Sequence, residues 1–453
     1  MKSILFIIPW RKSLEGNSTY DFANEAERAP ENVVSLATYL QSNNIKVKIA
    51  DMFKIMVDNR GNIEQSLNSL LNICTEYSPD YIGLSFFTAR FQQASIIVNF
   101  LRKHYPKNGK VKIIAGGVHP TLLPELTISC IDFDALIIGE GEIPLLKMLG
   151  DEEPGNIKGV FKAPEFNTEK ADVIDNLDDI PIPDWSLIDI NFYNRPSYLI
   201  SYDSPQGVMP ITFGRGCGYR CNFCAHSCFL KLRAHSAQYV FNMINSVAKQ
   251  CNVSSFIFQD STVGNYKKEW IDFCQMLIDH KCNYRWWINL RVNQADEDLL
   301  KIAQKAGCEK VFYGFESGSE RILKLMNKKI TIDQCKKTAA IHHKIGLPFY
   351  ASFIVNYIGE TEADLVLSEK LIRDTRPTSI AINKFSPIPG SADFERIKDK
   401  ILPHIKTIND WSLLGMLCSP VLLGDMPEER FNYWYNYLRE LRKTINNGNN
   451  KRG

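Results

Sequence analysis

The sequence predicts an α/β protein with an N-terminal doubly wound parallel sheet, a partial parallel (β/α)6 barrel and a C-terminal helical segment. Two long regions alternate short apolar runs with amphipathic segments, an Asp- and Pro-rich stretch separates them, and the alternation stops near residue 401. Continuous Val, Ile and Leu runs that alternate with helices are typical of parallel sheets buried on both faces. We therefore expect four parts, 1–150, a connector 151–204, 205–398 and a C-terminal cap and tail 399–453.

In the first region, apolar runs predict strands near 3–9, 47–51, 81–85, 111–115 and 135–138, with helices at 30–41, 63–75 and 92–104. Doubly wound sheets bind ligands in loops at the carboxyl ends of their strands. Those loops are residues 85–88, 116–120 and 139–142. The connector accumulates Asp and Pro between 175 and 185, which argues against a helix there.

In the second region, apolar runs predict barrel strands near 208–213, 255–259, 284–290, 310–315, 349–355 and 379–385. Active sites of parallel barrels lie at the carboxyl ends of strands. Beyond residue 401, helical spacing at 428–445 predicts a helix that packs on the barrel, and the polar tail 446–453 is expected to be disordered. We expect this segment to cap the substrate. Trp411, Trp434 and Tyr435 are candidate walls of the substrate site, but simple packing is the interpretation we favour for them.

Composition narrows the class of protein. The chain has 453 residues, 45% of them hydrophobic and 23% charged, and a net charge of +2, as in an ordinary globular protein without a broad nucleic-acid or membrane surface. The apolar run at the N-terminus is too short to cross a bilayer and lacks a signal-peptide cleavage site. Twelve scattered cysteines favour reduced thiols. We therefore expect a cytoplasmic monomer that binds neither nucleic acid nor membrane.

Three cysteines, Cys217, Cys221 and Cys224, follow the first barrel strand with the spacing C-x3-C-x2-C. A [4Fe–4S] cluster normally takes four protein thiolates. Three would leave one iron free to bind a cofactor or substrate. The alternative is a zinc site, with His226 or Cys228 as the fourth ligand.

This motif, with Phe223 before its last cysteine, resembles the cluster motif of the radical S-adenosylmethionine (SAM) superfamily. The resemblance implies that SAM chelates the open iron and that further segments contact SAM. Glu316 in 314–319 resembles the residue that binds the SAM ribose; the alternative is a strand-end Glu before Ser319 as a helix cap. Lys328 or Lys329 is a candidate for the SAM carboxylate, but we expect both to be solvated. The remaining SAM candidates are Phe223, Asp260, for which helix capping is an equal alternative, and Ser352 and Asn356 of the fifth strand. In that strand, Asn356 and Ile358 replace the Gly and Pro of the usual Gly-Leu-Pro-Gly-Glu.

The N-terminal region resembles the cobalamin-binding domain fused to one branch of this superfamily. The usual Asp-x-His-x-x-Gly motif, whose His ligates cobalt, is absent from residues 1–150, which leaves the lower cobalt face open, with Arg90 as a candidate neighbour. The alternative is a nucleotide- or flavin-binding sheet, but no Gly-x-Gly-x-x-Gly follows the first strand. The resemblance implies cobalamin contacts from residues at the strand ends: Ser85, Thr88, Gly116, Gly117, His119, Gly139, Glu140 and Gly141.

The paired resemblance implies an enzyme that methylates an unactivated carbon of a small metabolite or natural-product intermediate through methylcobalamin and a 5′-deoxyadenosyl radical. Both cofactors would supply the difficult chemistry, and no catalytic side chain is assigned. The electron donor would be a flavodoxin or ferredoxin. Alternatives are cobalamin-dependent cyclisation, ring contraction or oxidation without methyl transfer, a methylthiotransferase-like RNA modifier, and a non-catalytic cobalamin or redox sensor.

Overall fold

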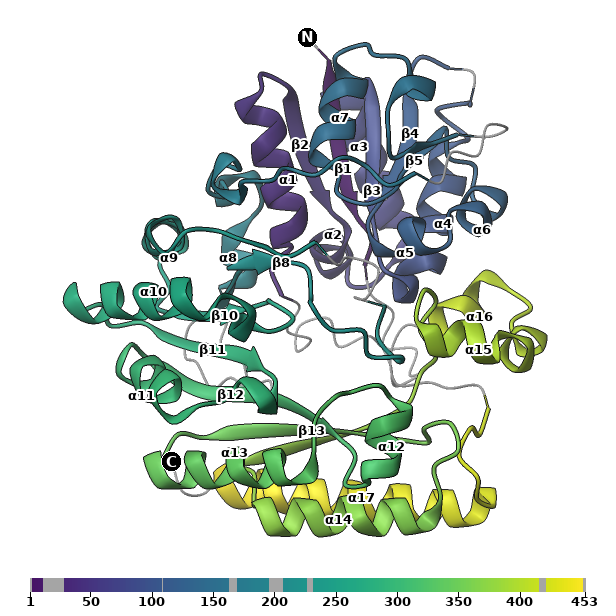
Figure 1. The fold of residues 1–453 in the computed structure, drawn as a ribbon. Coiled ribbons are helices and arrows are strands. Elements are labelled where there is room, and N and C mark those ends of the chain that lie inside the picture. The colour runs from purple at the N-terminus through teal and green to yellow at the C-terminus, as the bar shows by residue number, and fades with distance from the viewer. Residues whose placement is uncertain are drawn as a thin grey trace. The chain divides into compact units, whose positions relative to one another are not determined.

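The computed structural model describes residues 2–10, 28–107, 109–162, 169–194, 207–225, 231–414 and 421–450. The chain forms two compact units (Figure 1). The first unit comprises Met1–Tyr193 and Leu402–Met416, and the second comprises Asn194–Ile401 and Leu417–Gly453. Most of the predicted connector thus groups with the first unit, and the predicted C-terminal segment is divided between the two.

The first unit is built on a six-stranded sheet in the order β2-β1-β3-β4-β5-β6. Every described pairing is parallel except that of β5 with β6. All six residues of β1 are buried, which requires cover on both faces of the sheet. The doubly wound parallel sheet is therefore confirmed, with one antiparallel edge strand. The strands are β1 (Ser3–Ile8), β2 (Lys46–Asp51), β3 (Tyr81–Ser85), β4 (Lys112–Gly116), β5 (Ala135–Ile137) and β6 (Val160–Phe161).

Alternate residues of β1, Ile4, Phe6 and Ile8, pack with Ala37 of α1 and Leu145 of α7 in one buried cluster. The helices of the first unit are α1 (Glu31–Ser42), α2 (Met52–Asp58), α3 (Ile63–Tyr77), α4 (Phe91–Leu101), α5 (Val118–Leu122), α6 (Pro124–Cys130), α7 (Glu142–Leu149), α8 (Ile190–Tyr193) and α16 (Ile408–Leu413), with 3₁₀ turns η1 (Thr88–Arg90), η2 (Pro154–Asn156), η3 (Leu177–Asp179), η4 (Trp185–Leu187) and η8 (Leu402–His404).

The second unit is built on a six-stranded, all-parallel sheet in the order β14-β13-β12-β11-β10-β7, as expected of a partial barrel. A separate two-stranded hairpin pairs β8 with β9. The strands are β7 (Val208–Ile211), β8 (Gly214–Arg215), β9 (Arg233–Ala234), β10 (Ser255–Phe258), β11 (Arg285–Leu290), β12 (Cys308–Glu316), β13 (Phe349–Val355) and β14 (Ser379–Lys384).

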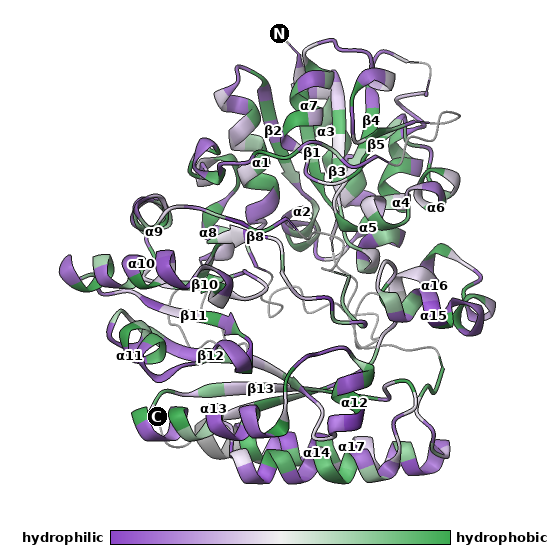
Figure 2. Cartoon of the chain, viewed as in Figure 1, coloured by the Kyte–Doolittle hydropathy of each residue, from purple (hydrophilic) through white to green (hydrophobic). Residues whose placement is uncertain are grey.

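The helices of this unit are amphipathic, as the alternating colours of α14 and α17 show (Figure 2). Local signals fix their ends: Thr331 and Gln334 form a capping box at the start of α13, and Gly346 ends it in the left-handed conformation. The helices are α9 (Ala237–Cys251), α10 (Lys267–Asp279), α11 (Glu297–Lys305), α12 (Glu320–Leu325), α13 (Ile332–Ile345), α14 (Glu362–Thr375), α15 (Ala392–Ile401) and α17 (Glu428–Asn450), with 3₁₀ turns η6 (Val263–Tyr266) and η7 (Val292–Gln294).

The C-terminal helix α17 packs on strand β14 and helix α14. Asn446 is buried, and its amide group bonds both backbone groups of Ile380: Oδ1 accepts from the N–H at 2.9 Å, and Nδ2 donates to the carbonyl at 3.2 Å. The expectation of disorder from residue 446 onward is therefore wrong for 446–450, because a side-chain amide there pairs with the open edge of β14.

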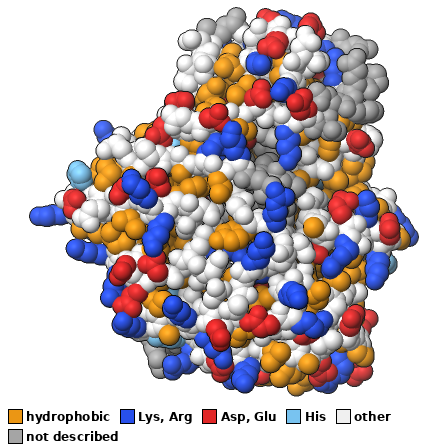
Figure 3. All heavy atoms as spheres, in the orientation of Figure 1, with side chains coloured by type: hydrophobic (Ala, Val, Ile, Leu, Met, Phe, Trp, Pro, Cys, Tyr) orange, Lys and Arg blue, Asp and Glu red, His pale blue; other side chains and the backbone are white. Residues whose placement is uncertain are grey.

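Charged side chains of both signs are interspersed on the face of the molecule in Figure 3, in keeping with the small net charge. Among the described residues, the structure contains no helix with the length and apolar character that crossing a bilayer requires.

Candidate active site and cofactor loops

The cysteine loop leaves β7 and is fastened at its base. Gly214 and Arg215 pair with Ala234 and Arg233, so the β8–β9 hairpin brings the two ends of the loop together. Asp260, just after β10, accepts hydrogen bonds from the backbone N–H groups of Phe213 at 2.9 Å and Gly214 at 2.6 Å. Both oxygens of this buried carboxylate are engaged, so Asp260 orients the start of the loop in this structure rather than capping a helix.

Gly216, next to Cys217, has φ +93°, and a Cβ there would lie 2.3 Å from the carbonyl oxygen of Lys231. Cys221 is buried, and Cys217 and Cys224 are partly exposed. Nowhere in the described residues do three His, Cys, Asp or Glu side chains gather closely enough to hold a single metal ion. A cubane spreads its ligands over several irons, with one thiolate on each, so three thiols in one loop fit such a cluster. His226 and Cys228, the candidate zinc ligands, lie outside the described residues.

Arg291, directly after β11, is a cationic side chain that contacts this loop. Its Nη1 lies 3.5 Å from Cys221 Sγ, and its guanidinium carbon lies 3.7 Å from the centroid of the Tyr219 ring. Nη2 donates to the carbonyl of Lys328. Arg291 is only 6% exposed, and its Nε has no hydrogen-bond partner among the described residues. A buried cation thus faces the cysteine thiol.

Lys328 connects Arg291 to Glu316. Its Nζ lies 2.7 Å from Glu316 Oε1, both side chains are buried, and the ammonium group is 5.7 Å from the centroid of the Phe223 ring. The expectation of a solvated Lys328 is therefore wrong, because its ammonium group is paired inside the unit; Lys329 is exposed, as expected. One run of contacts thus joins Cys221, Arg291, Lys328 and Glu316.

Glu316 ends β12 in a left-handed conformation, φ +64°, which is uncommon for a residue other than Gly and is often found at functional sites. The β12–β13 register shifts between Gly314 and Glu316. Ser319 caps α12 by accepting a bond from the N–H of Ile322, so the capping role expected for it is confirmed. A cap at Ser319 and a ligand at Glu316 are compatible, because different side chains carry them.

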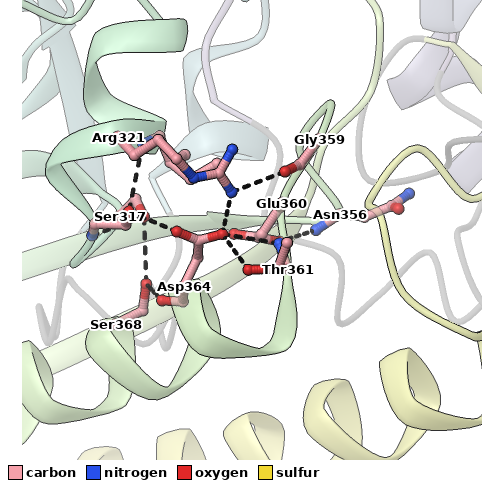
Figure 4. A network of polar contacts seen from close by, with 10 residues as sticks. Ser317, Arg321, Asn356, Gly359, Glu360, Thr361, Asp364 and Ser368 are labelled. Carbon is pink, nitrogen blue, oxygen red and sulfur yellow. Dashed lines mark hydrogen bonds and ion pairs between the residues drawn. The ribbon is translucent and has the colours of Figure 1, made fainter.

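A buried polar network ties the end of β12 to the start of α14 (Figure 4). Ser319 Oγ donates to Asp364 Oδ1 at 2.6 Å, and Arg321 contacts Oδ2 of the same carboxylate. Burial opposes ionisation of Asp364, but bonds from Ser319, Thr361 and Arg321 outweigh it and lower its pKa. Ser368 Oγ accepts from the Gly318 N–H at 2.9 Å. The network fixes the backbone that follows Glu316.

Asn356 follows β13 with φ +63°. This explains the departure from the usual family pattern, because Asn adopts the left-handed conformation more readily than other residues that carry a side chain. Asn356 Oδ1 accepts from the N–H groups of Leu423 at 2.8 Å and Gly424 at 3.1 Å, so its amide is engaged with the segment before α17. Its own N–H donates to Glu360 Oε2 at 2.7 Å, as Figure 4 shows.

Glu360 is fully buried, and its Oε1 has no partner among the described residues. Burial raises its pKa to about 8, although backbone bonds from Asn356 and Tyr357 oppose the shift. Of the other SAM candidates, Ser352 is partly exposed and accepts from Asn383 Nδ2 at 3.1 Å.

In the first unit, the predicted cobalamin residues come from the adjacent loops after β3, β4 and β5. Ser85 ends β3, and Gly116 ends β4 opposite it. Gly117 has φ +94°, and an added Cβ would lie 2.9 Å from Ser85 Oγ and 3.0 Å from the Phe86 nitrogen. Without a side chain at Gly117, the two loops approach each other and their partly exposed backbone stays open to a large flat ligand.

His119 and Thr88 are buried and bonded to each other, Nδ1 to Oγ1 at 3.0 Å. The imidazole ring lies 4.1 Å from the Phe91 ring and 5.7 Å from the Phe86 ring, between centroids, and its Nε2 has no partner in the described structure. Burial lowers the pKa of His119 to about 3, so the ring is neutral at ordinary pH. In this structure His119 is enclosed by protein, and its use as a cobalamin contact stays a prediction.

The third loop follows β5. The Gly139 N–H donates to Thr121 Oγ1 at 3.0 Å, and Gly139, Glu140 and Gly141 are all partly exposed. Arg90, the candidate neighbour of the cobalt, donates from Nη1 to the Pro9 carbonyl at 2.9 Å.

Helix α16 packs on η1 and α4 beside the loop after β3. Ser412 Oγ accepts from the Gln92 N–H at 3.2 Å. A segment from late in the chain therefore supports a loop of the N-terminal sheet, and it carries Trp411. The other two candidate substrate walls, Trp434 and Tyr435, lie on α17, which packs on β14; Lys384 Nζ is 4.4 Å from the Tyr435 ring centroid.

Comparison with family models agrees with this two-part geometry. Residues 211–372 match the model of the radical SAM superfamily, and residues 29–149 match that of the B12 binding domain. A parallel partial barrel with a three-cysteine loop after its first strand defines the radical SAM class. The chain belongs to the radical SAM superfamily and carries a B12-binding domain ahead of its radical SAM domain.

The chain is similar to curated proteins of several activities. It is 28% identical to an uncharacterised methyltransferase of Pyrococcus horikoshii, over 73% of this chain and 72% of that protein. It is also 28% identical to the anaerobic magnesium-protoporphyrin IX monomethyl ester cyclase of Rubrivivax gelatinosus, over 72% of this chain and 60% of the cyclase. The chain thus spans less than two thirds of the cyclase.

Two solved structures share the fold over nearly the whole chain. The radical SAM methyltransferase TsrM of Kitasatospora setae, with cobalamin and a [4Fe–4S] cluster, superposes with a TM-score of 0.71 at 14% identity, covering 97% of this chain and 88% of that one. The cobalamin-dependent radical SAM enzyme OxsB, with aqua-cobalamin, also gives 0.71 at 17% identity, over 98% and 72%.

The protein is therefore an enzyme whose cofactors are a [4Fe–4S] cluster, SAM and cobalamin. Its residues fit these groups. Cys217, Cys221 and Cys224 would hold the cluster beside the cation of Arg291, and glycine-bearing loops would receive the corrin. Sequence reasoning missed Arg291. The available signal was a charged residue directly after an apolar barrel strand, where active-site residues gather.

Proposed function

We propose that this protein is a cobalamin-dependent radical SAM methyltransferase acting on an unactivated carbon of a small metabolite or natural-product intermediate. The observation that carries the proposal is the pairing, in one chain, of a three-cysteine loop flanked by Arg291 and the Lys328–Glu316 pair with open glycine loops on a B12-binding sheet. When bound, the cofactors supply a methyl group and a radical that removes a substrate hydrogen atom.

The side chains would act by binding and orientation rather than as nucleophiles. Glu316 would accept a hydrogen bond from the SAM ribose, and Lys328, which pairs with that carboxylate, would also bind the SAM carboxylate. Ser352 and Phe223 would line the same site. Asp260 would hold the cluster loop, and Asn356 would fix the turn after β13.

On the first unit, the corrin would lie against the loops that carry Ser85, Gly116, Gly117 and the 139–141 segment. Thr88 and His119 would support these loops from beneath, because both are buried. We further propose a cytoplasmic monomer that receives electrons from a flavodoxin or ferredoxin and binds no nucleic acid.

The test is anaerobic reconstitution with iron, sulfide, cobalamin and reductant, followed by incubation with SAM labelled by deuterium in its methyl group. Candidate substrates are taken from the relatives: tryptophan, the substrate bound to TsrM, and magnesium-protoporphyrin IX monomethyl ester, named for the cyclase. The expected products are a substrate that carries the labelled methyl group, with one 5′-deoxyadenosine and one S-adenosylhomocysteine for each methylation.

Cyclisation is the second candidate function, because the Rubrivivax relative is named a cyclase. It predicts 5′-deoxyadenosine and a changed substrate without a labelled methyl group. A sensor would bind the cofactors and, across the substrate panel, yield no more 5′-deoxyadenosine than SAM alone.

A further inference from the structure

Arg291 is buried but takes no part in the SAM contacts described above. It follows β11, and its guanidinium group is held from three sides: over the Tyr219 ring, against the Lys328 carbonyl and beside Cys221. The N–H of Arg291 bonds to Gln294 Oε1 at 3.4 Å, and the same Gln294 oxygen accepts from Thr262. The turn after β11 therefore fixes the base of this side chain.

Nη1 points to the sulfur of Cys221 at 3.5 Å, within the range of a hydrogen bond to sulfur. Cys221 is the most buried of the three motif cysteines. Hydrogen bonds to the sulfurs, net charge and solvent exposure set the reduction potential of an iron–sulfur cluster. A buried guanidinium beside a ligand sulfur acts through the first two.

We propose that Arg291 is a positioning residue that donates a charged hydrogen bond to the Cys221 thiolate and raises the reduction potential of the cluster. Reduction adds one electron to the cluster and makes it more negative. A fixed cation at this distance therefore stabilises the reduced state more than the oxidised state. The proposal rests on the cluster assignment and is independent of methyl transfer.

Two substitutions test it in the full chain after reconstitution. Arg291→Gln removes the charge, and Arg291→Lys keeps the charge but cannot reach both Cys221 Sγ and the Lys328 carbonyl with one ammonium group. The control is Arg285→Gln at the opposite end of β11, where Arg285 pairs with Glu309 at 2.5 Å on the surface of the unit. The readout is the midpoint potential from a dithionite titration. The reduced cluster is followed by its electron paramagnetic resonance signal, whose amplitude is normalised to bound iron.

We expect the midpoint to fall from wild type to Arg291→Lys to Arg291→Gln. The full drop should correspond to about a tenfold loss in the reduction equilibrium constant, ~59 mV for one electron. Arg285→Gln should match wild type. If Arg291 only packed the loop, its substitution would change the amount of bound cluster but not the midpoint potential.

Wild-type midpoints in both Arg291 variants would overturn the proposal. If Arg291→Gln holds no cluster, Arg291→Lys decides: a lowered midpoint supports the role, and an unchanged one refutes it. Failure of both variants to take up iron while their circular dichroism stays native also refutes it, because the role would then be loop folding. Absence of a cluster in the wild type would instead refute the cofactor assignment.

Discussion

The two units prepare for their cofactors in opposite ways. In the second unit, charged side chains surround the cysteine loop: Arg291 beside Cys221, and Lys328 paired with Glu316. In the first unit, the loops present glycine and backbone, and the charge-capable ring of His119 is buried and neutral. An anionic cluster and a charged cofactor are bound by fixed charged side chains, whereas a broad corrin ring needs loops without projecting side chains. The difference shows that charged residues mark the candidate cluster site in the second unit, whereas glycines mark the candidate cobalamin site in the first.

The largest effect is expected from the cluster side. Cys221→Ala should abolish SAM cleavage and take bound iron to near zero, because the loop then has two thiolates. Cobalamin binding by the first unit should be retained if the two sites are independent. Cys130→Ala, an exposed cysteine of α6, is the matched control and should behave as wild type. Iron analysis and 5′-deoxyadenosine assay check this; cleavage that survives in Cys221→Ala contradicts the cluster assignment.

The corresponding change in the first unit is Gly117→Ala. Its positive φ costs about 1–2 kcal/mol for a residue with a side chain, and the added Cβ would press on Ser85 and Phe86. We expect cobalamin affinity to fall roughly tenfold, while cluster content stays unchanged, as measured by absorbance titration and iron analysis.

Gly346→Ala provides the control for backbone strain, since Gly346 also has positive φ, +70°, but nothing lies within 4 Å of an added Cβ. Equal cobalamin affinity in wild type and Gly117→Ala would show that the loop after β4 does not meet the corrin.

The two units should also respond to pH in opposite directions. In the second, burial raises the pKa of Glu360 from 4.5 to about 8. The contribution of protonated Glu360 to the free energy of unfolding is fully present below pH 4.5. It is lost as pH rises toward 8, by at most ~1.4 kcal/mol per pH unit. Glu360→Gln should flatten that slope. Urea unfolding with pulsed hydrogen exchange, read on β13 peptides, measures it.

The control is Glu362→Gln. The ion pair with Arg430 lowers the pKa of Glu362 to about 2, so its effect on stability is confined to acid and the slope between pH 5 and 8 should persist. If the pH dependence of stability persists in Glu360→Gln, it arises from another ionisable group.

In the first unit, burial lowers the pKa of His119 from 6.5 to about 3. Its contribution is complete above pH 6.5 and is lost as pH falls toward 3, again at up to ~1.4 kcal/mol per pH unit. His119→Phe keeps a ring against Phe91 and should remove the acid slope read on β4 peptides. An unchanged slope would mean that His119 ionises within the folded unit.

The smallest effect is expected where the late segment supports the N-terminal sheet. Ser412→Ala removes one hydrogen bond, to the Gln92 N–H, worth about 1 kcal/mol. We expect a slightly less stable first unit and a loss of cobalamin affinity below threefold, with β13 unaffected. Ser246→Ala on the surface of the second unit serves for comparison. A ten-fold loss of affinity would mean that α16 shapes the cobalamin site directly.

Much of the fold was predictable because its strands are continuous apolar runs. The strands at 81–85 and 349–355 have the predicted bounds, and both parallel sheets are confirmed. The short helix α2 was missed because it directly follows β2 and depends on Asp51, whose carboxylate caps its first turn.

The chemistry was less predictable where it depends on tertiary contacts. The three-cysteine spacing is local and readable. The burial of Lys328 depends on Glu316, twelve residues earlier, and the role of Asp260 depends on the backbone of Phe213 and Gly214, which no periodicity reveals. Asn356 was noted as a departure, but its bonds to the segment before α17 follow only from the folded chain.

The path of the backbone between the units has a practical consequence. The chain passes from the first unit to the second after Tyr193, returns at Leu402 and leaves again before Val421. A single protease cut at 193–194 would therefore leave part of the first unit, residues 402–416 with α16, on the fragment that carries the second unit. A fragment of residues 1–193 alone would lack helix α16, which packs on α4 and η1. This fragment should therefore be less soluble than one to which residues 402–416 are joined by a linker.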